Sequence, residues 1–340
     1  MTYPIFHGTG DTRNDETDIS IARPQDYSIF HEAQDYQCSE ALADAVNVAL
    51  LMNQPLFITG EPGAGKTQLA SRVAWELRLD LIKFETKSTT TAQDLFYTYN
   101  NLARFHAAHQ KKNVDERDFI TYQGLGKAII QANPLDAIIQ ENPLTTIKDI
   151  LPKKGSDYKG PTRSVVLIDE IDKAPRDFPN DILNELELMY FKIPQLDLDE
   201  PIKPPKDMFP IVIMTSNTEK QMPDAFLRRC VFHYIEFPKP ALMQDIVERR
   251  LPRIARQSSA FIKDAIDLFY KLRSDTSDFI KKPSTGELLV WISVMREMSP
   301  HLENPMQDKG KVLNALGALI KHEDDIQKAR MKVDEWMKSS

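Results

Sequence analysis

The sequence has few cysteines, no long apolar run and no excess of basic residues. Among its 340 residues only Cys38 and Cys230 carry thiols, too few for a disulfide scaffold and outside any C-x-x-C or Cys/His metal spacing. No apolar run approaches the ~18 residues that a membrane-spanning helix requires, and the first residues show no secretory signal pattern. Together these absences predict a soluble protein of the reducing cytoplasm, without a membrane span.

The charge balance is slightly acidic, with 43 Lys and Arg against 50 Asp and Glu and a formal net charge of -7. Such a charge does not attract nucleic acid or an anionic membrane, so neither is the expected partner. The length suggests about two domains, each large enough to bury its own core.

The hydrophobic pattern divides the chain into a lead-in and two domains. Residues 1–37 are polar and show no sustained period, so we expect an irregular segment there. All strand signals lie within residues 38–239, and only helical periodicity remains in residues 240–340. We therefore expect an α/β domain followed by a helical domain.

Five short apolar runs in residues 38–239 predict strands. They are Pro55–Thr59, Leu81–Glu85, Val165–Ile168, Ile211–Met214 and Val231–Ile235. Polar residues follow the third and fourth runs at once, as in parallel strands that deliver side chains to a ligand edge. About eighty residues separate the second run from the third, far more than an ordinary crossover, so we predict an insertion at about 97–160.

Helices are predicted from capping residues and apolar spacing. Ser39 is expected to cap a helix whose apolar side carries Leu42, Val46, Leu50 and Leu51. Residues 67–77 read as an amphipathic helix directly after the first strand. Within the insertion we expect helices at residues 95–110 and 124–132.

The first predicted strand leads into a stretch that satisfies the pattern G-x-x-x-x-G-K-[ST]. Its residues are Gly60, Glu61, Pro62, Gly63, Ala64, Gly65, Lys66 and Thr67. Such glycines let backbone N–H groups point at phosphate oxygens, and the N-terminus of the following helix adds partial positive charge. We expect Lys66 to contact the β and γ phosphates, Thr67 to bind Mg²⁺ through its hydroxyl, and Gln68 to belong to the same nucleotide site. An incidental glycine-rich turn is the alternative, against which the flanking strand and helix argue.

Two carboxylates, Asp169 and Glu170, follow the third strand within the sequence VVLIDEID. Asp169 can orient Mg²⁺, while Glu170 can polarise the water that attacks the γ-phosphate. A solvated acidic turn is the alternative. In the presence of a phosphate-binding loop, this pair predicts a hydrolytic site.

Asn217 closes the stretch Ile211–Asn217, whose first part is the fourth predicted strand. There its side-chain amide can contact the γ-phosphate and position the same water, because catalytic groups gather at the carboxyl ends of parallel strands. A simple turn residue is the other interpretation.

These motifs, together with the sequence PDAFLRRC at residues 223–230, resemble those of the AAA+ ATPases and, within them, the MoxR-like group. The resemblance covers roughly residues 38–325. It implies an α/β fold with an αβα core, a five-stranded parallel sheet of the P-loop NTPase type and a C-terminal helical lid. It also implies ATP and Mg²⁺ as cofactors, and a homo-oligomeric ring, commonly a hexamer, with nucleotide at the subunit interfaces.

The resemblance also implies roles for single residues. Asn217 matches the sensor 1 position, and Arg229 matches the arginine finger that reaches the neighbouring subunit's γ-phosphate, with the adjacent Arg228 a close second. Surface ion pairs of both arginines are the alternative. Thr86 occupies a position where AAA+ proteins often keep a polar residue that restrains the catalytic glutamate, and a simple strand-end hydroxyl is the alternative. Residues 284–287 read STGE where many members carry a sensor 2 arginine, so the chain lacks that arginine, and Lys281 or Lys282 is the candidate substitute.

The leading hypothesis is a chaperone-like, MoxR-like ATPase that remodels or matures a client protein, together with a separate partner carrying a von Willebrand factor A domain. A nucleic-acid motor or restriction-type subunit is an alternative, but the stretches Gln110–Lys112 and Lys153–Lys154 are only modestly basic. A nucleotide-gated scaffold with little turnover is a third hypothesis, against which the complete set of hydrolytic residues argues.

Overall fold

The structure is a computed structural model that describes residues 32–110, 114–141, 143–153, 156–217, 222–274 and 278–339. Most of the expected lead-in therefore lies outside the described residues, as do Lys111, Lys112 and Lys154 of the weakly basic stretches. The chain divides into two compact units. The α/β unit comprises Cys38–Glu61 and Lys66–Glu236, and the helical unit comprises Phe237–Ser340 with the described residues 32–37 and the segment Pro62–Gly65.

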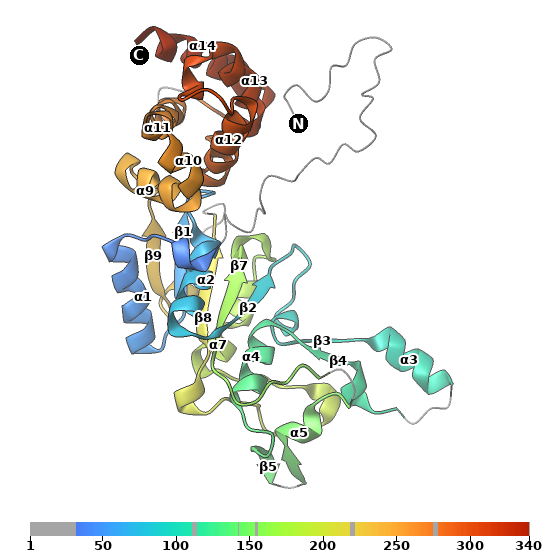
Figure 1. Cartoon of the computed structure of the whole chain (residues 1–340). Coiled ribbons are helices and arrows are strands. Elements are labelled where there is room, and N and C mark those ends of the chain that lie inside the picture. Colours follow the sequence, from blue (N-terminus) through green and yellow to red (C-terminus); the bar gives the residue numbers. More distant parts are fainter. Residues whose placement is uncertain are drawn as a thin grey trace. The chain divides into compact units, whose positions relative to one another are not determined.

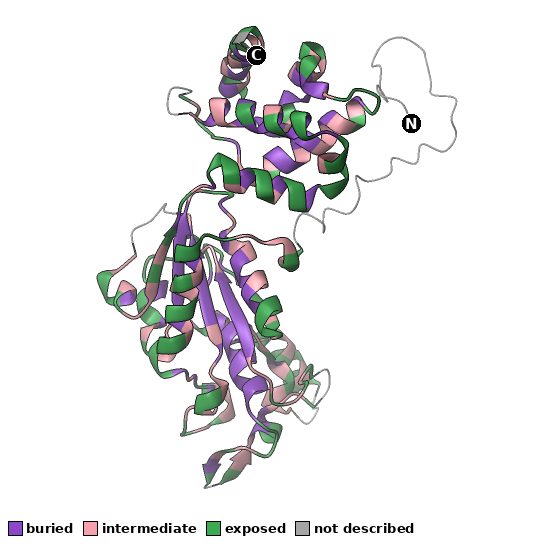
Figure 2. Cartoon of the chain, turned by 60° about the vertical axis from the view of Figure 1, so that its left-hand side comes forward, coloured by how far each residue is buried: buried purple, intermediate pink, exposed green. Residues whose placement is uncertain are grey.

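A single parallel sheet of five strands forms the centre of the α/β unit, in the order β2-β7-β8-β1-β9 (Figure 1). The strands are β1 (Leu56–Gly60), β2 (Asp80–Glu85), β7 (Ser164–Asp169), β8 (Ile211–Ser216) and β9 (Val231–Ile235). All of β1 and nearly all of β7 are buried, as expected for strands covered on both faces (Figure 2). The five predicted strands and the αβα class are confirmed.

Helices pack on both faces of this sheet. They are α1 (Glu40–Met52), α2 (Lys66–Leu77), α4 (Gly124–Ala132), α6 (Phe178–Asp181), α7 (Leu183–Leu188) and α8 (Asp224–Leu227). Ser39 caps α1 as predicted, because its hydroxyl accepts the Leu42 N–H at 3.3 Å. The predicted apolar side of α1 is only partly right: Leu42 is buried, but Leu51 is 86% exposed.

The insertion between β2 and β7 contains two small hairpins as well as helices. Its elements are β3 (Tyr97–Tyr99), α3 (Asn101–His109), β4 (Ile120–Tyr122), β5 (Ile138–Glu141), β6 (Leu144–Thr146) and α5 (Ile147–Ile150). The helix predicted at residues 95–110 is wrong in its first part, since Tyr97–Tyr99 pairs with β4 in antiparallel register. The helix predicted at residues 124–132 is confirmed as α4.

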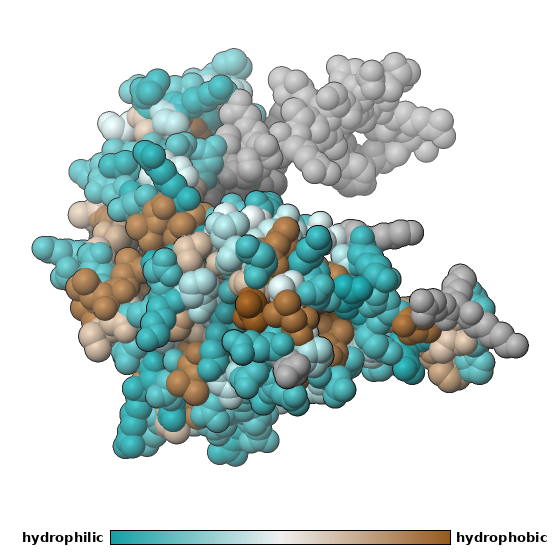
Figure 3. All heavy atoms as spheres, turned by 90° about the horizontal axis from the view of Figure 1, so that it is seen from below, coloured by the Kyte–Doolittle hydropathy of each residue, from teal (hydrophilic) through white to brown (hydrophobic). Residues whose placement is uncertain are grey.

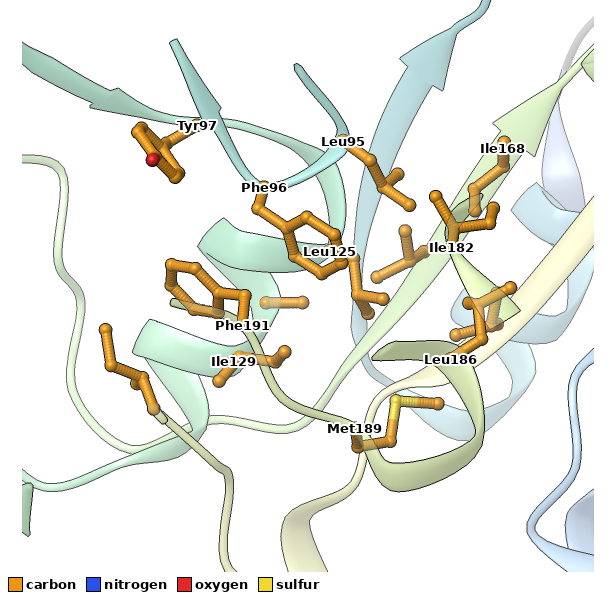
Figure 4. Packing of buried hydrophobic residues seen from close by; sticks show 14 of the residues in the cluster. Leu95, Phe96, Tyr97, Leu125, Ile129, Ile168, Ile182, Leu186, Met189 and Phe191 are labelled. Atoms are coloured by element: carbon orange, nitrogen blue, oxygen red, sulfur yellow. The ribbon is translucent and has the colours of Figure 1, made fainter. Parts of the chain in front are cut away.

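Aromatic packing ties this insertion to the core of the α/β unit (Figure 4). Phe96 stacks on Phe191 with ring centroids 5.4 Å apart. Helix α4 lies against the main chain of Phe96 at Gly126, where an added Cβ would be 2.0 Å from the Phe96 carbonyl oxygen. Phe191 itself forms an antiparallel bridge with Ile202, so the apolar stretch at residues 189–193 is largely buried in this core.

The helical unit has its own core. Its helices are α9 (Pro240–Arg250), α10 (Pro252–Gln257), α11 (Ser259–Arg273), α12 (Thr285–Met298), α13 (Lys309–Leu319) and α14 (Glu323–Ser339). Phe261, Phe269 and Trp291 are fully buried there, and the helical character of the C-terminal region is confirmed. Short 3-10 helices complete the described elements at Ala33–Asp35, Gln93–Leu95, Glu116–Phe119, Ile171–Lys173, Pro194–Leu196, Lys206–Met208 and Pro305–Gln307.

The face of the molecule shown in Figure 3 is mostly hydrophilic, with separate apolar areas. Within the described ranges, none of the helices combines the length and apolar character that crossing a membrane would require.

Candidate active site

The glycine-rich loop connects β1 to α2, as its motif requires. Gly60, Gly63 and Gly65 have positive φ values of 150°, 77° and 92°, which residues with a side chain adopt only at a cost. An added Cβ at Gly60 would also lie 2.5 Å from the carbonyl oxygen of Ile235 on the neighbouring β9. The backbone conformation accounts for glycine at all three positions, and the close approach of β9 adds a second reason at Gly60.

Lys66, the first residue of α2, is only 6% exposed. Its Nζ donates hydrogen bonds to the carbonyl oxygens of Gly60 at 2.8 Å and Glu61 at 2.9 Å. Burial lowers the pKa of Lys66, and the nearby carboxylates of Asp172 and Asp169 partly oppose this effect. The lysine side chain is thus folded back along the loop.

Thr67 and Asp169 bring two oxygen donors together at the end of β7. The Thr67 hydroxyl donates to Asp169 Oδ1 at 3.1 Å and lies 3.2 Å from Oδ2. Hydroxyl and carboxylate oxygens suit a hard cation such as Mg²⁺. The described residues contain no group of three or more His, Cys, Asp or Glu that could hold a metal ion. Mg²⁺ usually takes few protein ligands and completes its shell with water and phosphate, so the two oxygens fit it.

Glu170 follows Asp169 in an unusual backbone conformation, with φ of 54°. This left-handed conformation is uncommon for a residue other than glycine and interrupts the line of β7. The Glu170 carboxylate pairs with Lys173, and its Oε1 accepts a hydrogen bond from Asn217 Nδ2 at 3.2 Å. The structure therefore brings the predicted residues Glu170 and Asn217 into direct contact.

Thr86, which follows β2, contacts the main chain here rather than the glutamate side chain. Its hydroxyl donates to the carbonyl oxygen of Asp169 at 3.1 Å and to that of Glu170. Its own N–H donates to the Asp169 carbonyl at 3.2 Å. In this structure Thr86 therefore restrains the backbone that carries the glutamate.

Sequence reasoning missed two further polar residues beside these carboxylates. Thr215, in β8, is fully buried and contacts both Asp169 and Glu170. Asp172 is 3% exposed, and its Oδ1 accepts the main-chain N–H of Asn217 at 3.3 Å. Asp172 lies within the VVLIDEID run, but its role depends on the neighbouring strand and has no local signature.

The two candidate finger residues lie apart from this cluster. Arg229 Nε pairs with Glu187 Oε2 at 2.6 Å, and Nη1 donates to the carbonyl oxygen of Ala225 at 2.9 Å. Arg228 is exposed and has no ion pair within the described part of the chain. Within a single chain Arg229 therefore forms a surface ion pair, which was the alternative to its role as an arginine finger.

The residues at the expected sensor 2 position begin a helix. Ser284 and Glu287 form a capping box at the N-terminus of α12, in which Ser284 Oγ accepts the Glu287 N–H and Glu287 accepts the Ser284 N–H. Lys281 Nζ lies 3.8 Å from Glu287 Oε1. Glu287 therefore caps the N-terminus of α12, the helix to which it belongs.

Comparison with known proteins gives one family and a distant structural likeness. The family model described as "AAA domain (dynein-related subfamily)" matches residues 55–230. The RuvB Holliday junction branch migration motor of Thermotoga maritima aligns over 82% of this chain and 67% of its own, with 14% identity and a TM-score of 0.43. A point mutant of that protein aligns over 88% and 72%, with 14% identity and a TM-score of 0.44. No curated protein matches the sequence.

Proposed function

The chain belongs to the AAA domain family of the dynein-related subfamily, and on this premise we propose that it hydrolyses ATP in the presence of Mg²⁺. The observation that carries this proposal is the contact of Asn217 with Glu170 beside the Thr67–Asp169 pair. A phosphate-binding loop alone would support binding only. A carboxylate held by an amide next to a cation-binding oxygen pair supports hydrolysis.

The loop residues and the helix terminus would hold the triphosphate. The positive φ values of Gly60, Gly63 and Gly65 and the N-terminus of α2 suit a phosphate chain. Lys66 would move its ammonium from the loop carbonyls to phosphate oxygens, while Thr67 and Asp169 would hold Mg²⁺. When bound, Mg²⁺ would neutralise charge on the phosphates.

Glu170 is the proposed general base. Its carboxylate would accept a proton from the attacking water, and the side-chain amide of Asn217 would keep that carboxylate oriented and position the water. The ammonium group of Lys173 pairs with the Glu170 carboxylate and places a positive charge beside it.

We further propose that the active state is a ring in which Arg229, or the adjacent Arg228, completes the site of the next subunit. Neither arginine contacts Asp169 or Glu170 within the described part of the chain. A planar guanidinium supplied by a neighbour would stabilise the charge that develops on the transferred phosphoryl group. Arg229 would first have to leave its partner Glu187.

The finer assignment is a MoxR-like remodelling ATPase that acts on a client protein with a partner carrying a von Willebrand factor A domain. Its support is the sequence PDAFLRRC at residues 223–230 in combination with the hydrolytic residues. A pull-down from the native host with Glu170→Gln, which should hold ATP and retain clients, tests this assignment. Recovery of such a partner would support it, whereas ATPase activity stimulated by DNA with a steep salt dependence would favour a nucleic-acid motor.

Nucleotide binding needs its own test. Lys66→Ala should abolish nucleotide binding, measured with a fluorescent ATP analogue, while the fold stays intact by circular dichroism. If that variant bound nucleotide as well as the wild type, the loop would not be the binding site.

A further inference from the structure

Thr215 is a fully buried threonine in β8, at the centre of the sheet, and the proposed hydrolysis gives it no task. Its neighbours in the strand, Ile213 and Met214, are apolar and also buried. An apolar residue of similar volume would fill such a position without the need to satisfy a buried hydroxyl. The hydrogen bonds of Thr215 therefore call for an explanation.

The Thr215 hydroxyl uses both its donor and its acceptor capacity on the two catalytic-site carboxylate residues. It donates to Asp169 Oδ1 at 2.5 Å and accepts the main-chain N–H of Glu170 at 2.9 Å. One side chain thus fixes the carboxylate proposed to hold Mg²⁺ and the backbone of the proposed general base.

The backbone at Glu170 is held from both neighbouring strands. Strand β7 lies between β2 and β8 in the sheet. Thr86, after β2, donates to the Glu170 carbonyl oxygen, while Thr215, in β8, accepts the Glu170 N–H. A left-handed residue other than glycine persists only where its surroundings fix it, and these two threonines supply hydrogen bonds to both of its main-chain polar groups.

We propose that Thr215 is a positioning residue for this site: it fixes the Asp169 carboxylate for Mg²⁺ and holds Glu170 in the left-handed conformation that presents its carboxylate to Asn217. This proposal rests on the proposed ATPase function. In this proposal Thr215 contacts neither nucleotide nor the attacking water, and it acts only through Asp169 and Glu170.

Thr215→Val tests the proposal, because valine keeps the shape and removes both hydrogen bonds. We expect kcat to fall about 10- to 100-fold, and the Mg²⁺ concentration that half-saturates binding of a fluorescent ATP analogue to rise in the same range, as for other residues that orient metal ligands. Binding of the analogue in EDTA should stay unchanged, because the loop from Gly60 to Thr67 is untouched. Thr215→Ser, which keeps the hydroxyl, should restore both quantities to near wild type.

Ser164→Ala is the matched control. Ser164 is fully buried at the opposite end of β7, and its hydroxyl has no hydrogen-bond partner in the described structure. The Ser164→Ala substitution should leave kcat and the Mg²⁺ titration unchanged. A Thr215→Val protein that matches the wild type in both readouts, or a Thr215→Ser protein that loses as much as Thr215→Val, would overturn the proposal.

Two further measurements keep the test decisive. If Thr215→Val does not fold, hydrogen exchange of the Glu170 amide in the wild type still tests the contact: we expect strong protection, and rapid exchange would overturn the proposal. If the wild type shows no ATPase activity, the proposed function fails, while the Mg²⁺ titration of nucleotide binding and the amide exchange still report on Thr215.

Discussion

The side-chain amide nitrogen of Asn217 lies 3.2 Å from Oε1 of Glu170, although the two residues are 47 positions apart in the sequence. They sit at the carboxyl ends of β7 and β8, which are neighbours in the sheet. Parallel strands bring such residues to a common edge, where catalytic groups gather. This contact joins the proposed base to the residue proposed to position its water.

Removal of the Asn217 amide should impair hydrolysis more than binding. In Asn217→Ala the Glu170 carboxylate loses an orienting donor, and loss of positioning alone can cost about 100-fold in rate. We expect kcat to fall about 10- to 100-fold and the affinity for ATP to change less than about threefold. Asn47→Ala, an exposed position on α1, is the control that should behave like the wild type. An equal loss of affinity and kcat would contradict this role.

The arginine pair can be tested by mixing inactive subunits. Arg229→Ala should lower kcat by about a thousandfold if this guanidinium completes a neighbour's site, with Arg228→Ala made in parallel. Lys66→Ala removes the nucleotide-binding loop function from its own subunit. Mixtures of Lys66→Ala and Arg229→Ala subunits should then regain activity, because some interfaces combine an intact loop with an intact arginine. Full activity of both single arginine variants would exclude a shared site built on this pair.

Acid should destabilise the insertion through Asp115. Its carboxylate accepts hydrogen bonds from Arg117 Nε at 2.9 Å and Nη2 at 2.7 Å and pairs with Lys153 at 2.7 Å. The Arg117 contact chiefly holds the pKa of Asp115 far below its ordinary value. A carboxyl group with a depressed folded pKa stabilises the fold above its unfolded pKa of about 3.9 and loses that contribution as pH falls further.

Asp115→Asn should therefore lower stability at pH 7 by about 1 kcal/mol, the upper range for partly exposed ion pairs. Its free energy of unfolding should also depend less on pH below about pH 4 than that of the wild type. Urea titrations across this range measure both effects, with the exposed Asp44→Asn as the control. A parallel pH dependence in the wild type and in Asp115→Asn would contradict this assignment.

The two thiols should differ in reactivity. Burial raises the pKa of the Cys230 thiol to about 12, and its Sγ also donates to the Phe226 carbonyl oxygen at 3.3 Å. Partial desolvation raises the pKa of the Cys38 thiol as well, but this residue remains exposed to solvent. Iodoacetamide at pH 8 should alkylate Cys38 well before Cys230, whereas both should react alike in urea. Peptide mass spectrometry resolves the two, and early alkylation of Cys230 would contradict the raised pKa of this half-buried thiol.

The sheet was predictable because its strands are continuous apolar runs that end on polar residues. Val165–Ile168 shows the limits of that signal: the strand actually begins at Ser164 and ends at Asp169, since polar residues at strand ends carry no apolar signature. The helix expected at residues 95–110 failed for another reason. Tyr97–Tyr99 becomes a strand because β4 pairs with it, and a pairing partner outside the local window leaves no mark on helical periodicity.

The residues of the candidate site likewise divide into those that a local motif reveals and those that only the fold reveals. Lys66, Thr67, Asp169 and Glu170 stand in motifs whose spacing is set by the chemistry, so the sequence points to them. Thr215 and Asp172 have no such spacing, because their partners come from a neighbouring strand of the sheet. Their hydrogen bonds became visible only when the register of β7 against β8 was known.

Hydrolysis of ATP by the wild type and by Glu170→Gln tests the central claim most directly. Phosphate release at saturating ATP and Mg²⁺ should be measured beside binding of a fluorescent ATP analogue, with the exposed Glu141→Gln as a charge-matched control. We predict that the wild type and Glu141→Gln turn over ATP, and that Glu170→Gln binds the analogue with near wild-type affinity but releases no phosphate above background. Phosphate release by Glu170→Gln at the wild-type rate would contradict the account.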